Sequence, residues 1–578
     1  MKKHTSKKAL TLVLAIVLTF TLAVSAFATW SSYQGNQKNN GRITSGQPPI
    51  SPTPTVTAVP LNYNNPDYSV FTGVDAASVI QGNYAFTLYN GGVSGSNNVG
   101  GARMQATDVR DGSTRWNIQL DDDASNDMQL STPYYSSGDN TIYATVTRTE
   151  AFQTYTSMSG WTVSGATITG GTATFTGGNQ SVSTTLNLTT AVSTIQLSTD
   201  LALNTTGATG SYTITLSDNN SNAVYTLASG GLNADWYGTY ATYNGVWIPA
   251  GSYTLTFTVD SLSGGSADLS TMTLSRYYWR LYSVSNANTL SPVLSSVLAS
   301  GEGQINTHIN CISKHLFFGG FGGDHAYYQY GPIDGAASLK KFIPGLGDDF
   351  DDFYYAGASM FSENDSTKVV FGSESGKVYI RPVGDYFDSA ANLLIDLNTM
   401  QSDCGNIRSS ICVVGSDWYL SSNGADTNGY LWRITQTQNN VFAATCLELP
   451  YKTTSTPAVS SNNYIYLGYN YGYTIGGVYA IPADFTDSTT PITIYSGDPV
   501  QSSPIVFSDD VEEYVYFTTN SYTGAGYCYY WEAGDQTTID EVWAAGGSSG
   551  NPFAVQGFSA ENGYLVYGDD GNYLYIVH

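Results

Sequence analysis

A repeated strand pattern constrains this chain more than any other feature. The stretch Ser455–Ile481 reads as a strand opening on Ser-Thr-Pro, an Asn turn, an alternating Tyr/Ile/Leu strand, a glycine loop and a further strand. Related stretches begin at Ser131, Ser409 and Ser502, and the last one ends the chain at His578. Alternation with period two, interrupted by turn residues, is typical of short antiparallel strands. The pattern therefore predicts an all-β fold built from one repeated unit.

The spacing of the repeats indicates the size of that unit. Inner-strand starts are expected near eight positions: Ala77, Ser131, Gln304, Gly357, Ser409, Ser455, Ser502 and Ala554. Most steps are about 46 to 53 residues, the length of four short strands. The step from Ser131 to Gln304 is roughly 120 residues longer than one unit requires.

One repeat carries a sharper motif, A-x-D-x-x-x-G-x-x-x-W, with Asp108, Gly112 and Trp116. At these residues, and at the Ser-[Ser/Thr]-Pro starts, the chain resembles the pyrroloquinoline-quinone-type β-propeller repeat family. The resemblance implies an eight-bladed propeller, with seven blades as the alternative. It also implies that Trp116 packs between neighbouring blades, while Asp108 and Gly112 shape the turn before it.

The extra residues fall in the second repeat, at 151–276, between its second and third strands. Runs of alternating apolar and Ser/Thr residues predict a β-sandwich there, and NGVWIPAGSYTLTFTVDS resembles jelly-roll carbohydrate-binding and adhesin modules. The propeller is expected to occupy 67–150 and 277–578. Loops that join second to third strands share one face of a propeller with loops that join blades, so the sandwich is expected on that face.

The start of the chain is typical of a secreted protein. Residues 1–28 combine a basic stretch, an apolar run and Ala26-Phe27-Ala28, which together predict a signal peptide rather than a membrane span. Residues 29–66 are rich in proline and predict an extended arm, in which Thr55–Leu61 could pair as an edge strand and close the ring. Secretion to the extracellular space is expected, with association with the cell surface left open.

Composition excludes several partners. The formal net charge is −25, and clustered Lys and Arg are absent from the sequence after the leader. Nucleic acid and anionic membrane are therefore poor candidate partners, because phosphate binding needs such clusters. The five cysteines are scattered, which argues against a disulfide framework but leaves one or two bridges open, for example from Cys404 or Cys412 to Cys446.

The predicted ligand surface lies in the sandwich. Residues 151–275 contain no Lys, Arg, His, Glu or Cys. They contain instead a cluster of five aromatic residues: Trp236, Tyr237, Tyr240, Tyr243 and Trp247. Flat rings and neutral hydrogen-bonding groups suit an uncharged glycan, although packing inside the protein would also explain many of these rings.

Acidic and histidine residues give weaker signals. The runs Asp121–Asp127 and Asp348–Asp352 leave calcium as an open alternative, although solvated turns explain such runs more often. His308, Asp324 and His325 would meet only if the third repeat starts where it is placed, while His315 falls on the opposite face. No cofactor is expected, and the sequence nominates neither a metal-ligand set nor a catalytic residue.

Three function classes follow from these features. A noncatalytic binding or adhesion protein that recognises an extracellular glycan or a cell-surface protein is favoured. A carbohydrate-active enzyme on a propeller is the alternative, although no pair of carboxylates stands out. A quinone-dependent dehydrogenase is the least favoured, because the resemblance would then imply adjacent cysteines, and the chain has none.

Overall fold

The structure is a computed structural model of an all-β protein. It describes residues 32–44, 46–61, 74, 76–90, 101–121, 127–203, 209–233, 239–345, 351–364, 366–391, 393–472, 474–535, 537–546 and 553–578, with the backbone alone at 127–129, 193, 233 and 239–246. Its described helices are two short 3-10 turns, η1 (Tyr33–Gly35) and η2 (Leu397–Thr399). Within this part of the chain, no helix is long and apolar enough to cross a bilayer.

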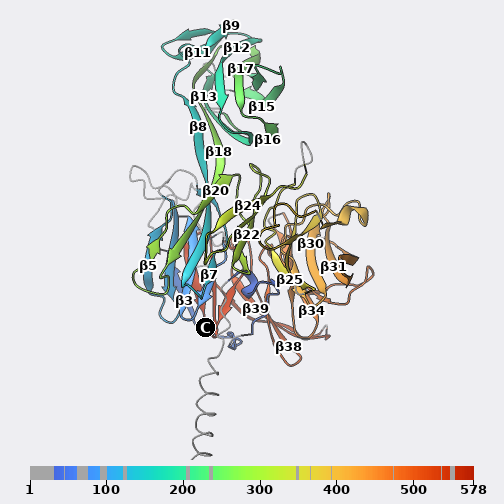
Figure 1. Cartoon of the computed structure of the whole chain (residues 1–578). Coiled ribbons are helices and arrows are strands. Elements are labelled where there is room, and N and C mark those ends of the chain that lie inside the picture. The colour runs from blue at the N-terminus through green and yellow to red at the C-terminus, as the bar shows by residue number, and fades with distance from the viewer. Residues whose placement is uncertain are drawn as a thin grey trace, which may run out of the picture.

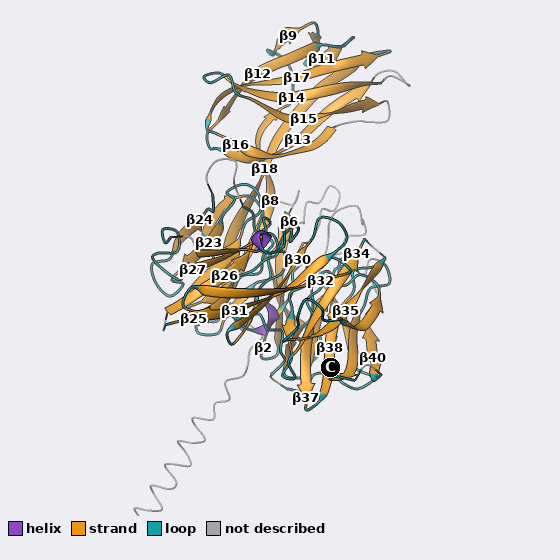
Figure 2. Ribbon diagram, turned by 90° about the vertical axis from the view of Figure 1, so that its right-hand side faces the viewer, coloured by secondary structure: helices purple, strands orange, loops and turns teal. Residues whose placement is uncertain are grey.

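The propeller consists of four-stranded antiparallel sheets arranged around an axis (Figures 1 and 2). Six of these sheets take their strands in chain order. They are β2 (Val79–Gln81), β3 (Tyr84–Asn90), β4 (Ala102–Asp108) and β5 (Thr114–Gln119); β21 (Asn310–Ile312), β22 (His315–Gly319), β23 (Tyr327–Gly331) and β24 (Ser338–Phe342); β25 (Ser359–Glu363), β26 (Ser366–Gly372), β27 (Lys377–Pro382) and β28 (Leu393–Asp396); β29 (Cys412–Val414), β30 (Asp417–Asn423), β31 (Gly429–Gln438) and β32 (Val441–Leu449); β33 (Ala458–Val459), β34 (Tyr464–Tyr471), β35 (Ile475–Pro482) and β36 (Ile492–Gly497); β37 (Ile505–Asp509), β38 (Glu512–Thr518), β39 (Gly526–Glu532) and β40 (Ile539–Ala545).

A seventh four-stranded sheet joins the two ends of the chain. Its inner three strands are β41 (Ser559–Glu561), β42 (Tyr564–Gly568) and β43 (Tyr573–Val577), and its outermost strand is β1 (Val56–Pro60) from the arm. β1 runs antiparallel to β43, from Val56 opposite Val577 to Pro60 opposite Tyr573. The first inner strand, β2, contacts β41 on one side and the second blade on the other. The ring is therefore closed by a strand from near the N-terminus.

The second blade is part of a ten-stranded sheet that also enters the sandwich. Its blade strands are β6 (Asp127–Leu130), β7 (Tyr134–Ser136), β8 (Thr141–Tyr155), β18 (Ala267–Ser285), β19 (Val293–Leu294) and β20 (Ala299–Glu302). The long strands β8 and β18 stay paired from Thr141–Ser285 to Tyr155–Met272. They leave the propeller as a continuous two-stranded ribbon that carries the sandwich above one face (Figure 1). The insert thus lies between the second and third strands of blade two, as the repeat spacing predicted.

The sandwich has jelly-roll topology. One sheet has the order β10-β11-β18-β13-β16 and the other β15-β14-β17-β12-β9. Its own strands are β9 (Thr162–Ser164), β10 (Thr167–Thr169), β11 (Thr172–Phe175), β12 (Gln180–Leu188), β13 (Val192–Leu203), β14 (Thr209–Asp218), β15 (Val224–Asn233), β16 (Thr239–Ile248) and β17 (Gly251–Ser263). If β11 to β18 are numbered one to eight, the sheets read 1-8-3-6 and 2-7-4-5, which is the order of two interleaved Greek keys.

Strict alternation explains why the sandwich strands pack. In β17, Tyr253, Leu255, Phe257 and Val259 are almost fully buried, while the residues between them face outward. Successive side chains of a strand point to opposite faces of its sheet, so one face fills the core and the other meets solvent. Trp161, expected to be a core residue, lies in this core, where its ring packs edge-on against Tyr155.

All five cysteines are free thiols in the structure. Four are buried, and Cys446 is half-buried. Burial raises the pKa of Cys311 to about 11 and those of Cys404 and Cys446 to about 12. The bridges that the sequence left open, between Cys404 or Cys412 and Cys446, are therefore not formed in this structure.

Candidate functional site

The Ser-[Ser/Thr]-Pro starts of the repeats line the propeller axis and tie adjacent blades together. Thr456 Oγ1 accepts a hydrogen bond from Ser410 N of the preceding blade at 2.9 Å, and Ser503 Oγ accepts one from Thr456 N at 2.7 Å. Thr132 Oγ1 accepts from Ala77 N at 3.1 Å in the same way. The second residue of the motif therefore links neighbouring backbones around the axis, which accounts for a small hydroxyl residue at this position.

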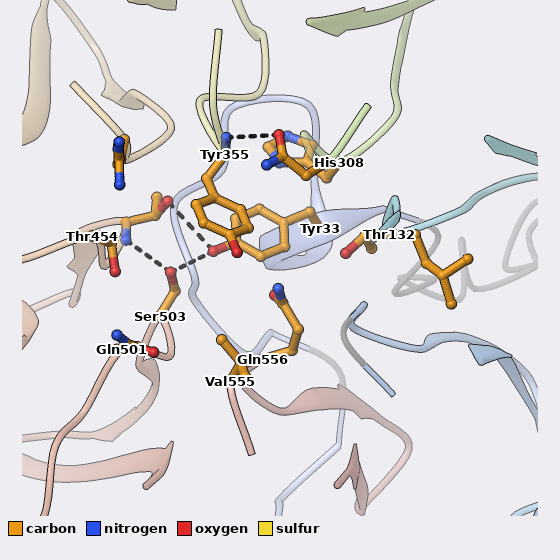
Figure 3. Close-up of a pocket in the computed structure, with 13 residues that line it drawn as sticks. Tyr33, Thr132, His308, Tyr355, Thr454, Gln501, Ser503, Val555 and Gln556 are labelled. Carbon is orange, nitrogen blue, oxygen red and sulfur yellow. Dashed lines mark hydrogen bonds between the residues drawn. The ribbon is translucent and has the colours of Figure 1, made fainter. Parts of the chain in front are cut away.

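A pocket opens among these residues (Figure 3). We call it the axial pocket. Most of its lining residues lie at one of two positions just before an inner strand. The residues two positions before an inner strand are Thr132, His308, Thr456 and Ser503. The residues four positions before one are Leu130, Asn306, Tyr355, Arg408, Thr454, Gln501 and Val555. Together with Tyr33 and Gln556 they surround about 490 Å³, a volume that includes open solvent at the mouth. Several blades therefore contribute to one site on the axis.

The other end of the axis is filled by the segment 32–43. The carbonyl oxygens of Gln37, Lys38, Asn40 and Gly41 accept hydrogen bonds, at 2.8 to 3.0 Å, from one backbone N–H in each of the inner strands β25, β29, β33 and β37 in turn. An inner strand has an unpaired edge, and these bonds satisfy it. Gly41 has φ +63°, and a Cβ there would lie 2.7 Å from that of Ala458, so no larger residue fits. The segment winds around the axis and seals it.

Tyr33 of this segment forms the floor of the axial pocket. Its ring stacks on His308, with centroids 4.4 Å apart and planes 19° apart. Its hydroxyl makes a short hydrogen bond with Ser503 Oγ, and it donates to Thr456 Oγ1 at 3.4 Å (Figure 3). A Cβ on Gly357 would lie 2.0 Å from the His308 ring, so glycine makes room for the imidazole. The sequence motif gave no hint of this role, because the segment around Tyr33 has no strand periodicity.

The axial pocket is close to electrically neutral. Burial lowers the pKa of His308 to about 3, so its imidazole is uncharged near pH 7. Arg408 is the charged residue of the lining, and its Nε and Nη2 atoms donate to the Glu374 carboxylate at 2.9 and 2.8 Å. Its guanidinium also lies 4.7 Å from the centre of the Tyr354 ring. A bidentate partner of this kind offsets the positive charge locally.

The structure describes the five predicted aromatic residues of the sandwich to different extents. Trp236 and Tyr237 lie outside the described residues, and Tyr240 and Tyr243 belong to β16, whose side chains are described only near its end. Trp247 is half-buried, and its ring centre lies 6.0 Å from that of His325 in a propeller loop. Trp247 is thus directed at the junction between the two parts of the molecule. The glycan-binding role of all five rings stays a prediction.

Polar contacts fix this junction. His325 Nδ1 lies 2.8 Å from Asp352 Oδ1, which also accepts a hydrogen bond from Gly322 N at 2.8 Å. Gly323 N donates to Thr194 Oγ1 of the sandwich at 3.4 Å. At the base of the ribbon, Arg276 pairs with Glu302. The loop at 318–325 therefore supports the sandwich from below.

The outer face of the five-stranded sheet presents rows of hydroxyl groups. Thr256 of β17 stands between Ser183 of β12 and Thr215 of β14. The full set, which we call the hydroxyl face, consists of Ser181, Ser183, Thr185, Thr213, Thr215, Ser217, Thr254, Thr256 and Thr258. Neighbouring strands are about 4.8 Å apart, and side chains on one face repeat about every 6.8 Å along a strand. The result is a flat array without Lys or Arg.

The acidic and histidine residues do not assemble a metal site among the described residues, where no group of three potential ligands occurs. Asp121 is buried and accepts from Arg148 at 3.0 Å and from Tyr282 at 3.1 Å. Asp351 accepts from Tyr379 at 2.9 Å. These two carboxylates act as structural anchors, and the rest of the two runs, apart from Asp352 and the backbone of Asp127, lies outside the described residues.

The histidines are also separated. His308 is on the axis, while His325 pairs with Asp352 at the junction. Asp324 accepts hydrogen bonds from Tyr328 at 3.0 Å and Lys341 at 2.6 Å. The minor alternative in which His308, His325 and Asp324 meet is therefore not realised, because their side chains contact different partners.

The motif of the first repeat forms a blade-to-blade contact. Asp108 accepts from the Arg110 guanidinium at 2.6 and 2.8 Å, which holds the pKa of that carboxyl well below its usual range. Gly112 has φ +70° and closes the turn with a bond from its N–H to Asp108 O at 2.8 Å. Trp116 is buried and its Nε1 donates to Ala287 O of the second blade at 2.8 Å.

Comparison with known proteins adds little to this picture. No protein-family model matches the chain, and no curated protein matches it in sequence. Among solved structures, Sqt1 from Chaetomium thermophilum is similar at 11% identity, with a TM-score of 0.43, over 89% of this chain and 97% of that one. Quinohemoprotein alcohol dehydrogenase from Comamonas testosteroni is similar at 10% identity, with a TM-score of 0.37, over 97% of this chain and 82% of that one. BamB from Moraxella catarrhalis is similar at 10% identity, with a TM-score of 0.33, over 53% of this chain and 79% of that one. At these values the likenesses carry no functional argument, and the fold rests on the sheets themselves.

Proposed function

We propose that this chain is a secreted, noncatalytic binding or adhesion protein, in which the propeller is a platform and the sandwich recognises a neutral glycan. The observation that carries the proposal is the hydroxyl face, an array of Ser and Thr side chains across β12, β17 and β14. Hydroxyl groups both donate and accept hydrogen bonds, as sugar hydroxyls do, so such a face can pair with a polysaccharide surface without any charge.

The mounting of the sandwich supports a role in presentation. β8 and β18 form one ribbon from inside the propeller into the sandwich, and Thr194 and Arg276 anchor its base. A module held at a fixed angle loses little orientational freedom when it binds. The five-stranded sheet is the one that β8 and β18 do not enter, so its outer face is clear of the ribbon.

Three carboxylates of the sandwich are better suited to structure than to catalysis. Asp218 accepts bonds from the turn residues Asn220 and Ser221, Asp200 accepts from Ser270 at 2.8 Å, and Asp260 accepts from Thr213 at 2.6 Å. Glycoside hydrolysis requires two carboxyl groups placed on either side of one bond. Each of these three carboxylates is hydrogen-bonded to its own partner on a different strand or turn, which favours binding over hydrolysis.

The test is retention of the mature chain, residues 29–578, on insoluble neutral polysaccharides such as cellulose, chitin and mannan. Thr256→Lys puts a strongly hydrated charge in the centre of the hydroxyl face, and we expect it to reduce retention at least tenfold. Thr437→Lys is the matched control, because Thr437 is exposed on the propeller and the charge change is the same.

A second variant separates the two candidate surfaces of the sandwich. Trp236→Ala tests the aromatic segment and should leave thermal unfolding of the propeller nearly unchanged. Loss of retention in Trp236→Ala alone would move the glycan from the hydroxyl face to the aromatic segment. Absence of retention on every polysaccharide, or equal retention in all variants, would overturn the proposal.

A further inference from the structure

The axial pocket contains buried hydrogen-bonding groups that the protein itself does not satisfy. Asn306 Nδ2 and His308 Nε2 are inaccessible to solvent and make no hydrogen bond of normal geometry with the described residues, although the backbone of Ala358 lies close to the His308 ring. The two residues are 7% and 4% exposed, and both line the pocket. An unsatisfied buried polar group is costly, so such groups mark places where a ligand or an ordered water completes the network.

We assign both nitrogens as hydrogen-bond donors from the contacts of their neighbouring atoms. Asn306 Oδ1 accepts from Tyr355 N at 3.3 Å, which fixes the amide so that its NH₂ group is left over. Ser410 Oγ accepts from Gly357 N at 3.0 Å, so its own hydrogen is available for His308 Nδ1 at 3.3 Å. A neutral imidazole that accepts at Nδ1 carries its proton on Nε2. The pocket therefore offers two donors and requires oxygen acceptors.

We propose that the axial pocket is a second binding site, in the propeller itself, for the uncharged end of a hydroxyl-bearing ligand such as a single neutral sugar residue. This site is separate from the sandwich and does not depend on the glycan-binding role proposed for it.

The rest of the lining matches this chemistry. Thr454, Gln501 and Gln556 add neutral polar groups, and Leu130 and Val555 add small apolar surfaces. A sugar ring presents both hydroxyl groups and C–H faces, and the Tyr33 and Tyr355 rings suit the latter. An ionised ligand would meet no unpaired charge of opposite sign in the described lining, because Arg408 is already held by Glu374.

The shape of the pocket limits how much of a ligand enters. Tyr33 closes its floor, and the segment 32–43 fills the axis below. Much of the surrounded space belongs to the open mouth. Most of its lining precedes the inner strands, in loops between blades, and such loops share a face with the connection that carries the sandwich. The geometry therefore suits one terminal residue rather than the middle of a chain, which would need two exits.

The experiment is titration calorimetry of the mature full chain with glucose, galactose, mannose and N-acetylglucosamine, with glucuronate as the charged comparison. We expect at least one neutral sugar to bind in the millimolar range, and glucuronate to bind at least tenfold more weakly. Asn306→Leu removes one donor at similar volume and should weaken the binding at least tenfold.

Two further variants keep the test decisive. Thr454→Val removes a half-buried hydroxyl from the rim, with no expected effect on folding, and should weaken binding about threefold even where Asn306→Leu fails to fold. Thr256→Lys, on the hydroxyl face, should leave sugar affinity unchanged, so a failure here is distinguishable from a failure of the sandwich proposal. Absence of binding by every sugar would show that the pocket holds water only and would overturn the inference. Sugar affinity equal to that of the wild type in both Asn306→Leu and Thr454→Val would also overturn it, because the sugar would then bind elsewhere.

Discussion

The sandwich takes its core from one stretch of sequence, whereas the closing sheet of the propeller takes its core from both ends of the chain. Every buried residue of the sandwich core lies between Met158 and Leu274. The core around the closing sheet combines Ile43 and Val59 from the arm with Tyr575 and Val577 from the last strand. The sandwich can therefore complete its fold locally, while the ring is complete only when its two ends meet.

The two regions also differ in how they present polar groups. The sandwich exposes hydroxyl groups on the flat outer face of a sheet, whose inner face is an ordinary apolar core. The propeller directs its hydroxyl and amide groups inward, to the axis, where Asn306 and His308 are buried. A flat surface suits an extended ligand, and a closed pocket suits the end of one. Variants in one region should consequently leave the other intact.

The largest effect is expected from Val59→Asp in β1. Val59 is 6% exposed in the core of the closing sheet, so the substitution buries a carboxylate without a partner. We expect the free energy of unfolding of the propeller to fall by about 4 to 5 kcal/mol. Calorimetry that resolves two transitions would measure this, with the sandwich transition unchanged.

Val56→Asp is the matched control, because Val56 is on the same strand but 40% exposed. Its effect should be below about 1 kcal/mol. Equal destabilisation by the two variants would mean that β1 is not held by its buried face.

Phe257→Ala should destabilise the sandwich instead of the propeller. Phe257 is fully buried and stacks on Tyr212, with centroids 5.8 Å apart. Removal of the ring leaves a cavity, and we expect a loss of about 3 to 4 kcal/mol confined to the sandwich transition. A parallel shift of the propeller transition would show that the ribbon couples the two units into one cooperative fold.

A pH dependence should distinguish the axis from the sandwich, which contains no histidine between residues 151 and 275. The pKa of His308 is lowered to about 3 by burial, whereas an unfolded histidine titrates near 6.5. The unfolded chain therefore binds the proton first, and stability falls as the pH drops below about 6.5. From pH 7 to pH 4, protonation of this residue in the unfolded chain should lower the free energy of unfolding of the propeller by about 3 kcal/mol.

His308→Gln isolates this contribution from that of the carboxyl groups. The variant has no proton to bind at this position, so the propeller's loss of stability from pH 7 to pH 4 should be smaller than in the wild type by that amount. Chemical denaturation at a series of pH values measures the difference. Identical pH profiles would mean that the His308 ring is not buried in solution.

Repetition explains which parts of this fold could be predicted from the sequence. The blades repeat a similar alternation at a similar spacing, and three of them begin with Ser-[Ser/Thr]-Pro, at Ser131, Ser455 and Ser502. The propeller and the position of its insert therefore followed from periodicity and spacing. The segment around Tyr33 forms no strand: its bonds go one by one to different blades, and no local pattern encodes that. Sequence spacing left open whether His308 and His325 would meet, because their separation depends on which way each side chain turns.

The smallest predicted effect tests the contact by which the motif of the first repeat joins the second blade. Trp116→Phe keeps an aromatic ring beside Phe86 but removes the Nε1 donor, which leaves Ala287 O of the second blade without its bond at 2.8 Å. We expect the free energy of unfolding of the propeller to fall by about 1 to 2 kcal/mol.

Trp161→Phe is the control in the sandwich, because Trp161 is equally buried but has no side-chain hydrogen bond to another described residue. It removes the same atoms, so the difference between the two losses in thermal unfolding measures the contribution of the hydrogen bond. If the two losses are equal, Trp116 contributes to blade docking through its packed area alone.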